Sequence, residues 1–213
     1  MIIVINGSEK EQYRAVLDQY FRIRAQVFDE RLKWDVIVQD GMEFDAFDDL
    51  NPVYLISVDE QTGQVRGGLR MLPTTGPNML RDIFPFLLPD GDVIQSPTIW
   101  EVSRFAMDHF SEAPDPGRLL SYVTGELLAG VVEVSMQSGI SFVVAVFDPR
   151  MRRVCHAAGC PPEILGEPQK VGDYMTYAGL FEMSDNELAN IRNACGIEGS
   201  VLIPQNPRKS AAA

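Results

Sequence analysis

An almost unbroken apolar run at residues 140–147 is the feature that most constrains how this chain can fold. Gly139 precedes the run and Asp148-Pro149 follows it, so its length is that of a single strand. A strand without polar alternation is buried on both faces, which happens where helices cover both sides of a sheet. The segments 10–31 and 117–139 have the three- and four-residue apolar spacing that such covering helices require.

The remaining segments alternate between strand and helix patterns, with turns at Pro and Gly residues between them. Strands are expected at 1–6, 53–58, 65–72, 98–105 and 173–183, and shorter helices at 80–88, 149–158 and 184–194. Ser8 and Glu11 have the spacing of a capping box at the start of the first helix. This order predicts an α/β fold, a three-layer αβα sandwich with a mixed sheet, as one domain over residues 1–204. Residues 205–213 are expected to form a disordered tail.

Composition excludes several classes of partner and site. With 18 Lys and Arg against 30 Asp and Glu, the net charge of -12 argues against non-specific nucleic-acid binding, which needs a basic face. The apolar runs are too short for a membrane span, and the apolar start of the chain lacks the basic region and cleavage site of a signal peptide. Three cysteines without zinc-like spacing predict reduced thiols in the cytoplasm and no metal site.

The strand predicted at 98–105 carries polar residues inside an apolar pattern. Alternation along a strand assigns these residues to opposite faces of the sheet, with Glu101, Ser103 and Phe105 on one face and Trp100, Val102 and Arg104 on the other. Charges in such a strand are costly to bury unless they are paired. Two alternatives follow: an edge strand whose charged face meets water, or a buried polar site that residues from elsewhere complete.

Further charged residues within apolar patterns are candidates to complete such a site. Arg24 lies one turn before Phe28 in the first predicted helix, and Arg70 alternates with apolar neighbours in its strand. Asp45 and Asp48 belong to an acidic stretch with interleaved aromatic residues, which we interpret as a loop or a short turn of helix. An acidic loop is usually solvated, and an arginine can lie along a helix surface. Carboxylates beside aromatic rings also suit a small cationic ligand.

The joint order and spacing of these residues resemble the LuxI-type acyl-homoserine lactone synthases, the family that makes a diffusible quorum-sensing signal. The resemblance extends through most of the first two-thirds of the chain and rests on Arg24-x3-Phe28, Arg31-x2-Trp34-Asp35, Asp45-x2-Asp48, Arg70, Pro73-Thr74-Thr75, Phe84-Pro85 and Trp100-Glu101-x-Ser103-Arg104-Phe105. It implies a fold related to the acetyltransferase (GNAT-like) superfamily. It also implies a reaction in which the amine of S-adenosylmethionine attacks an acyl thioester, after which lactone closure expels methylthioadenosine.

The resemblance implies roles for the charged and aromatic residues. S-adenosylmethionine is expected to be consumed as a co-substrate, with no recycled cofactor, and its predicted binding residues are Arg24, Phe28, Trp34, Asp45, Asp48, Arg70, Phe84 and Arg104. The charged residues among these, together with Glu101, are three acids and three bases that can balance their own charge. The predicted catalytic residues are Glu101 as the base that takes a proton from the amine, Asp45 as the alternative base, and Ser103.

The acyl thioester needs oxyanion donors and an apolar pocket. Backbone N–H groups beside Phe105 and Ala106 are the predicted donors, made available by a bulge in the central strand. The predicted acyl wall is formed by Met79, Leu80, Val144, Val146 and Phe147. Because residues 143–147 carry no hydroxyl, the resemblance predicts an acyl chain unsubstituted at C3. The alternative is that this strand is plain core.

The family implies acyl carrier protein or acyl-CoA as the acyl donor. Arg150, Arg152 and Arg153 are the predicted docking residues for an acidic carrier protein, the alternative being a solvated helix face. The residues after Phe147 lack the glycine-rich pyrophosphate loop of many acetyltransferases, which favours a carrier-protein donor. Two rival functions remain open: an N-acyltransferase of the same fold acting on another amine, and a catalytically silent binding module.

Overall fold

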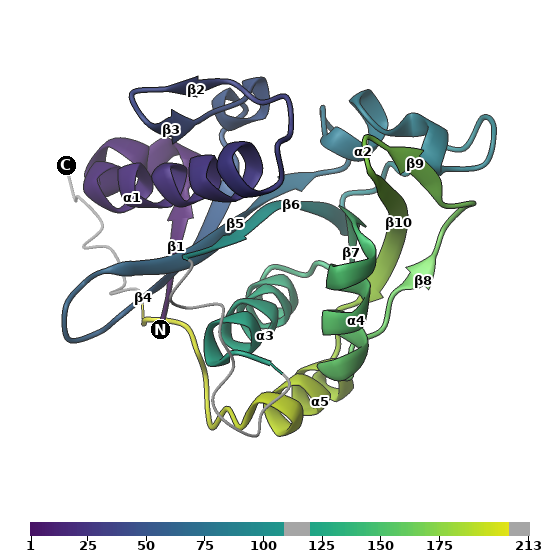
Figure 1. The fold of residues 1–213 in the computed structure, drawn as a ribbon. Helices are drawn as coiled ribbons and strands as arrows, with labels where there is room; N and C mark the ends of the chain where they lie inside the picture. The colour runs from purple at the N-terminus through teal and green to yellow at the C-terminus, as the bar shows by residue number, and fades with distance from the viewer. Residues whose placement is uncertain (109–119, 205–213) are drawn as a thin grey trace, which may run out of the picture.

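The computed structural model describes residues 1–108 and 120–204, and its centre is one mixed sheet (Figure 1). The strands lie in the order β1, β4, β5, β6, β7, β10 and β8, and β9 pairs with β10. Their bounds are β1 Ile2–Asn6, β4 Val53–Val58, β5 Val65–Pro73, β6 Ile99–Met107, β7 Phe142–Phe147, β8 Glu163–Ile164, β9 Gln169–Val171 and β10 Tyr174–Glu182. Among these strands only β6 and β7 pair in parallel, and the helix between them is the crossover that a parallel pair requires.

Helices cover both faces of the sheet, as the doubly buried strand predicts (Figure 1). α1 (Arg14–Arg24) packs on one face against β5 and β6. α3 (Tyr122–Gln137) packs on the opposite face, with α5 (Asp185–Cys195) against it and α4 (Pro149–Ala157) beside β10. This is the predicted three-layer αβα arrangement. The predicted tail and the first residues of the helix predicted at 117–139 lie outside the described residues. So do residues 109–116, most of a segment whose prolines and acidic residues predict a loop.

The first predicted helix consists of three connected segments, η1 (Gly7–Tyr13), α1 and the π-helical η2 (Ala25–Arg31). Its capping box is formed by Asn6 and Glu9, two residues earlier than predicted, because β1 ends at Asn6 and the chain turns there; Asn6 Nδ2 donates to Glu9 Oε2 at 2.8 Å. At the other end the wider π turn lets the Trp34 N–H donate to the Phe28 carbonyl at 2.8 Å. This bond brings Trp34 back beside Phe28.

Between η2 and β4, where a loop or a short turn of helix is predicted, the structure contains a hairpin and a turn of 3-10 helix. A short hairpin, β2 (Val38–Gln39) and β3 (Met42–Glu43), leads into the 3-10 turn η3 (Ala46–Asp49), and the hairpin packs against α1 and η2. The helix predicted at 80–88 is divided into α2 (Met79–Asp82), which packs on β6, and the 3-10 turn η4 (Pro85–Leu87). Proline has no N–H to donate, so the helix ends before Pro85.

β6 and β7 pair along only part of their length. Their parallel register ends at Val102 and Ala145. Beyond these residues β6 continues along β5 while β7 continues along β10, and Figure 1 shows the two strands separating. The sheet therefore opens near its middle, beside the residues that the sequence predicts to be catalytic.

β6 also contains a bulge, which changes the side chains that share a face. The register against β5 shifts by one residue between Ser103 and Ala106. Arg104 has a φ of 55°, a left-handed conformation uncommon in residues other than glycine. Arg104 consequently lies on the same face as Glu101, since both contact Met79, and Phe105 packs on the opposite face. The strict alternation predicted from the sequence is therefore wrong at Arg104 and Phe105.

Three apolar clusters fill the layers. The largest lies between the sheet and the helices α3 and α5. The second lies beneath α1, and the third lies beneath α2 and η4, around Leu80, Leu87, Leu88, Val144 and Ala178. No helix within the described ranges is long and apolar enough to cross a membrane.

Candidate active site

Six charged side chains meet on the face of the sheet that α1 covers. They come from the end of α1 (Arg24), from β3 (Glu43), from the turn at η3 (Asp45 and Asp48), from β5 (Arg70) and from β6 (Arg104). Contacts between three arginines and three carboxylates connect them all. We call these six residues the ion-pair network. Its formal charge is zero, which is the condition for burying so many charges together.

Arg24 is fully buried and holds the inner side of the network. Its Nη1 and Nη2 atoms donate to Asp48 Oδ1 and Oδ2, each at 2.9 Å, and its Nε donates to Glu43 Oε2. Tyr54 Oη also donates to Asp48 Oδ1, at 2.8 Å. A forked contact of this kind fixes the orientation of both partners. Arg24 therefore determines where the carboxylates of Asp48 and Glu43 point.

Asp45 is the carboxylate that the other two arginines share. Arg70 donates to both of its oxygens, with Nη2 to Oδ2 at 3.0 Å, and Arg104 Nη2 lies 2.8 Å from Oδ2. Arg104 also contacts Glu43 Oε1 at 3.1 Å, and Arg70 Nε donates to Ser103 Oγ at 3.2 Å. Asp45 is 17% exposed and Arg104 8%, more than any other member. The network therefore reaches solvent at Asp45 and Arg104.

The network keeps its groups charged although it is buried. Burial alone would raise the pKa of Asp48, but the Arg24 guanidinium outweighs burial and lowers the Asp48 pKa below its ordinary value. Burial would lower the pKa of Arg24, and the same pair raises it instead. Burial raises the pKa of Tyr54, so its hydroxyl remains a donor to Asp48. At neutral pH the pair of Arg24 and Asp48 is therefore fully ionised.

Glu101, predicted to belong to the charged set, stands apart from it. Its side chain is 1% exposed, and its two oxygens accept hydrogen bonds from the backbone N–H groups of Met79 (3.0 Å) and Leu80 (2.6 Å). Burial raises the pKa of Glu101, and the two N–H groups offset this only in part. Glu101 thus connects β6 to the start of α2, and Glu43 takes its expected place among the three acids.

Glu43 is the site residue that sequence reasoning missed. It is 1% exposed, and its two oxygens contact different arginines, Arg24 and Arg104. One signal was available in the sequence. Glu43 and Asp45 are two residues apart, and in extended backbone such residues project to the same side. Because Asp45 was already a candidate site residue, this spacing indicates that Glu43 lies beside it.

The predicted aromatic residues Phe28 and Trp34 lie at the open side of the network. Their rings stack with centroids 5.2 Å apart and planes 21° apart, and the Arg104 guanidinium lies 5.2 Å from the Phe28 ring. Trp34 is 42% exposed, so one face of this pair is available to a ligand. Phe84 packs instead against the third apolar cluster, next to Phe86.

The predicted acyl-wall residues are divided between the two faces of the sheet. Leu80, Val144 and Val146 share the third apolar cluster, with Met79 just before Leu80 in α2. Ala106 belongs to the cluster beneath α1, whereas Phe105 joins the cluster beneath α3. Phe147 stacks on Tyr177 at 6.0 Å and contacts Phe181, which also packs beneath α3. These residues therefore do not form one continuous wall on a single face of the sheet.

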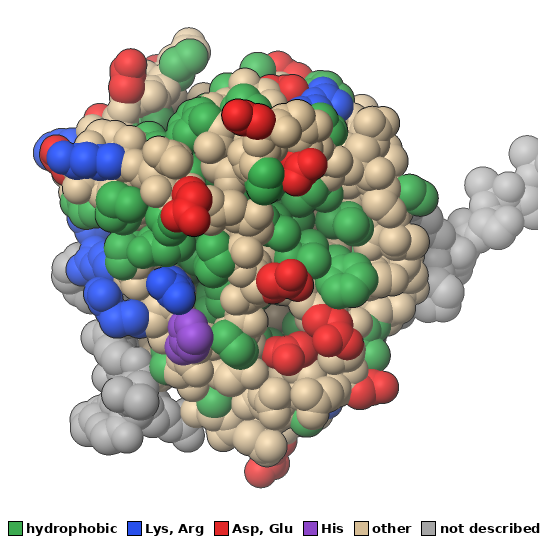
Figure 2. Space-filling model, turned by 90° about the vertical axis from the view of Figure 1, so that its right-hand side faces the viewer, with side chains coloured by type: hydrophobic (Ala, Val, Ile, Leu, Met, Phe, Trp, Pro, Cys, Tyr) green, Lys and Arg blue, Asp and Glu red, His purple; other side chains and the backbone are tan. Residues whose placement is uncertain are grey.

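The basic residues predicted for docking lie on α4, where Arg152 and Arg153 line a surface groove of about 450 Å³. Its lining residues are Pro149, Arg152, Arg153, His156 and Tyr177, and we call it the α4 groove. The Arg152 guanidinium lies 5.2 Å from the Tyr177 ring. Arg150 is exposed but does not line the groove. Figure 2 shows most of the basic side chains of this view at its left-hand edge, with acidic side chains spread over the face.

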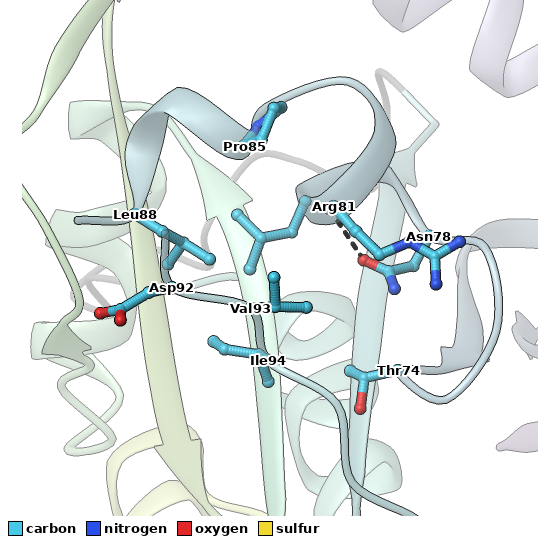
Figure 3. A pocket seen from close by; sticks show the side chains of 9 residues that line it. Thr74, Asn78, Arg81, Pro85, Leu88, Asp92, Val93 and Ile94 are labelled. Atoms are coloured by element: carbon cyan, nitrogen blue, oxygen red, sulfur yellow. Dashed lines mark hydrogen bonds between the residues drawn. The ribbon is translucent and has the colours of Figure 1, made fainter. Parts of the chain in front are cut away.

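A smaller cavity of about 60 Å³ lies between α2, η4 and the segment before β6 (Figure 3). Val93, Ile94 and Leu88 face into it, and the Asn78 side chain accepts a hydrogen bond from Arg81 N–H at 3.0 Å beside it. Ligand pockets usually measure several hundred Å³, so this cavity is too small for a nucleoside. Within residues 1–108 and 120–204 no group of three or more His, Cys, Asp or Glu is placed to hold a metal ion.

Comparison with known proteins adds four findings. The sequence model of a family described as Autoinducer synthase matches residues 8–191. The acyl-homoserine-lactone synthase of Agrobacterium fabrum is 37% identical over 178 residues, which is 84% of this chain and 84% of that protein. A solved structure of a CoA-dependent acyl-homoserine lactone synthase, BjaI, with SAM and isopentyl-CoA, is 30% identical, covers 98% of this chain and 94% of its own, and has a TM-score of 0.85. A putative N-acetyltransferase from Lactobacillus plantarum, 12% identical with a TM-score of 0.56 over 86% of this chain and 99% of its own, shares the fold alone.

Proposed function

Because this chain belongs to the autoinducer synthase family, we propose that its ion-pair network binds S-adenosylmethionine and presents the amine of that ligand to an acyl thioester. The chain is an acyl-homoserine-lactone synthase. The observation that carries the assignment of the site is its charge. The six-residue network is neutral, and buried Glu101 beside it adds one negative charge. S-adenosylmethionine has a sulfonium, an ammonium and a carboxylate, so it brings one net positive charge to balance the site.

The exposed side of the network defines where the ligand lies. Asp45 would face a cationic centre, and Arg104 would donate to the ligand carboxylate. Trp34, stacked on Phe28, offers an aromatic face to the sulfonium or the adenine. Arg24 is fully buried and engaged with acids on all sides. We assign Arg24 to holding the carboxylates in place, not to direct contact with the ligand.

The reaction exchanges bonds in two steps. In the first, the neutral amine attacks the thioester carbonyl carbon; a C–N bond forms, the C–S bond breaks, and the departing thiolate takes the proton that the nitrogen releases. In the second, the ligand's carboxylate attacks the methylene carbon bonded to sulfur; a C–O bond closes the lactone and methylthioadenosine leaves with the electron pair of the broken C–S bond. Nucleophile and electrophile of the second step share one molecule, so restraint of its conformation is the protein's main contribution.

The acyl donor would enter where β6 and β7 part. This opening begins beside Val102 and Ala145 and adjoins the bulge in β6. A bulge takes N–H groups out of the regular ladder, and those near Phe105 and Ala106 are the proposed donors to the thioester oxyanion. An acyl chain passing through the opening would meet residues of both faces, which accounts for the divided acyl wall.

The α4 groove adjoins the end of β7 that has left β6, since Phe147 there pairs with Tyr177 of the groove. Its arginines suit the phosphate of a pantetheine arm, which acyl carrier protein and acyl-CoA have in common. The BjaI structure is described as CoA-dependent and contains isopentyl-CoA. We therefore retain both donors, with Arg152 and Arg153 as the residues that receive the arm.

The test supplies purified protein with S-adenosylmethionine and the same acyl groups linked to carrier protein or to CoA. Mass spectrometry should detect methylthioadenosine only when an acyl donor is present, together with a product that yields the protonated homoserine lactone fragment. An acylated amine without methylthioadenosine would support the rival N-acyltransferase. Absence of any product with every donor would contradict the proposed function.

A further inference from the structure

Glu101 binds backbone N–H groups at the start of α2, although the sequence predicts it to be the catalytic base. We propose that Glu101 is a positioning residue that holds the start of α2, and with it the Met79 side chain, against the ion-pair network, and that water takes the proton that the ammonium of the ligand loses before the attack. This inference rests on the proposed function, because the amine in question is that of S-adenosylmethionine.

Both oxygens of Glu101 are engaged with backbone. Oε2 accepts the Met79 N–H at 3.0 Å and Oε1 accepts the Leu80 N–H at 2.6 Å. These are the first N–H groups of α2, which have no partner within a helix. Asn78 accepts the N–H of Arg81, at 3.0 Å. A proton placed on Glu101 would weaken one of its two bonds and loosen the start of α2.

Glu101 acts on the site through Met79. The Met79 Sδ atom lies 3.3 Å from Arg104 Nη1 and 3.5 Å from Arg70 Nη2, so it touches both arginines that share Asp45. Sulfur is a weak acceptor, so the thioether fills the space beside the two guanidinium groups without competing with Asp45. If the Met79 backbone were released, both guanidinium groups could turn, and Asp45 and Arg104 would lose the geometry that receives the ligand.

The amine itself does not require a strong base. The sulfonium of S-adenosylmethionine favours the neutral form of its amine, because like charges disfavour protonation. The ammonium proton passes to water at the open side of the network, and the nitrogen keeps the electron pair with which it attacks the thioester. The oxygens of Asp45 are already occupied by Arg70 and Arg104.

Glu101→Gln separates the two roles, because glutamine keeps the size but only one of the two acceptors. We expect the KM for S-adenosylmethionine to rise about tenfold, from the loss of one charge-assisted hydrogen bond. The fall of kcat/KM at acidic pH should keep its wild-type midpoint, because the group that titrates there is the amine of S-adenosylmethionine and not Glu101. If that fall disappears while KM stays unchanged, Glu101 is the base and the proposal is wrong.

Met79→Leu provides an independent test that does not depend on how well the Glu101 variant folds. Leucine keeps the volume and removes the sulfur between the guanidinium groups, and we expect a rise of about threefold or more in the KM for S-adenosylmethionine. In the double variant the two effects should be less than additive, because both act through one contact. A kinetically silent Met79→Leu, or fully additive effects, would overturn the proposal. A wild-type protein that releases no methylthioadenosine with any donor would refute the proposed function itself, so the two failures are distinguishable.

Discussion

Glu43→Gln is the most direct perturbation of the ion-pair network. Glutamine keeps the shape of Glu43 but removes its charge, and its amide nitrogen would meet a guanidinium, so that two donors face each other. The buried network would then hold three arginines against two carboxylates. Arg24 Nε and Arg104 Nε, both of which now donate to Glu43, would each lose a charged partner.

The expected loss of stability depends on the carboxylate partners that Arg24 and Arg104 retain when Glu43 is replaced. Removing one partner of a buried ion pair costs about 3–5 kcal/mol. The lower figure applies here, because Arg24 retains both oxygens of Asp48 and Arg104 retains Asp45. We therefore expect the free energy of unfolding to fall by about 3 kcal/mol. For a chain of this size the melting temperature falls by about 2–4 °C per kcal/mol, so the expected decrease is about 6–12 °C.

The assay is urea unfolding followed by circular dichroism, with calorimetry for the melting temperature. Glu11→Gln is the matched control, because Glu11 is 90% exposed and lies 4.0 Å from Arg14, so its loss should change stability by about 0.5 kcal/mol or less. The slope of the unfolding free energy against urea should be the same for both variants if only stability changes. A Glu43→Gln protein as stable as the control would refute the view that Glu43 balances the buried arginines.

Three further outcomes test other parts of the molecule. Arg104→Ala should weaken S-adenosylmethionine binding about tenfold or more, since it removes a charged donor to the ligand carboxylate; unchanged affinity in calorimetry would exclude that contact. Arg153→Glu, in the α4 groove, should raise the KM for the acyl donor, whereas Arg150→Glu on the same helix but outside the groove should leave it nearly unchanged; equal effects of the two variants would argue against the groove as the donor site. Because the pKa of Asp48 is lowered on folding, its contribution to stability is fully present above the unfolded value of about 3.9 and is lost as the pH falls through the lower folded value. Asp48→Asn should therefore be less stable than wild type at pH 7 and show a weaker loss of stability below about pH 4; parallel stability curves for the two proteins would contradict this.

Most of the regular elements were predictable from local patterns. The strand expected at 53–58 coincides with β4, and the helix expected at 184–194 agrees with α5 to within one residue, with Ser184 as its N-cap. The apolar run at 140–147 contains β7 and correctly predicted helices on both faces of the sheet. These predictions succeed because side-chain periodicity depends on neighbours along the chain, and those neighbours are present in the sequence.

The family resemblance also implied five members of the ion-pair network, Arg24, Asp45, Asp48, Arg70 and Arg104, whereas the local pattern of charges left solvated alternatives open. It did not identify which acid meets which arginine. Glu43 was passed over, since its two-residue spacing from Asp45 is the one local signal and the arginines that it meets are distant in sequence. Its partners Arg24 and Arg104 are 19 and 61 residues away.

Only the tertiary structure decided the remaining features of the site. The bulge predicted in the central strand is present in β6, but its effect of turning Arg104 onto the face of Glu101 depends on pairing with β5, a strand about 30 residues earlier in the chain. The parting of β6 and β7 beyond Val102 and Ala145 opened the sheet beside the site. Glu101 accepts hydrogen bonds from the N–H groups of Met79 and Leu80 at the start of α2, not from an arginine. These two residues lie 22 and 21 positions before Glu101 in the chain. The physical reason is common to all three: periodicity determines which residues are buried, but the partners of a buried charge or an unpaired backbone group are set by contacts between segments distant in sequence.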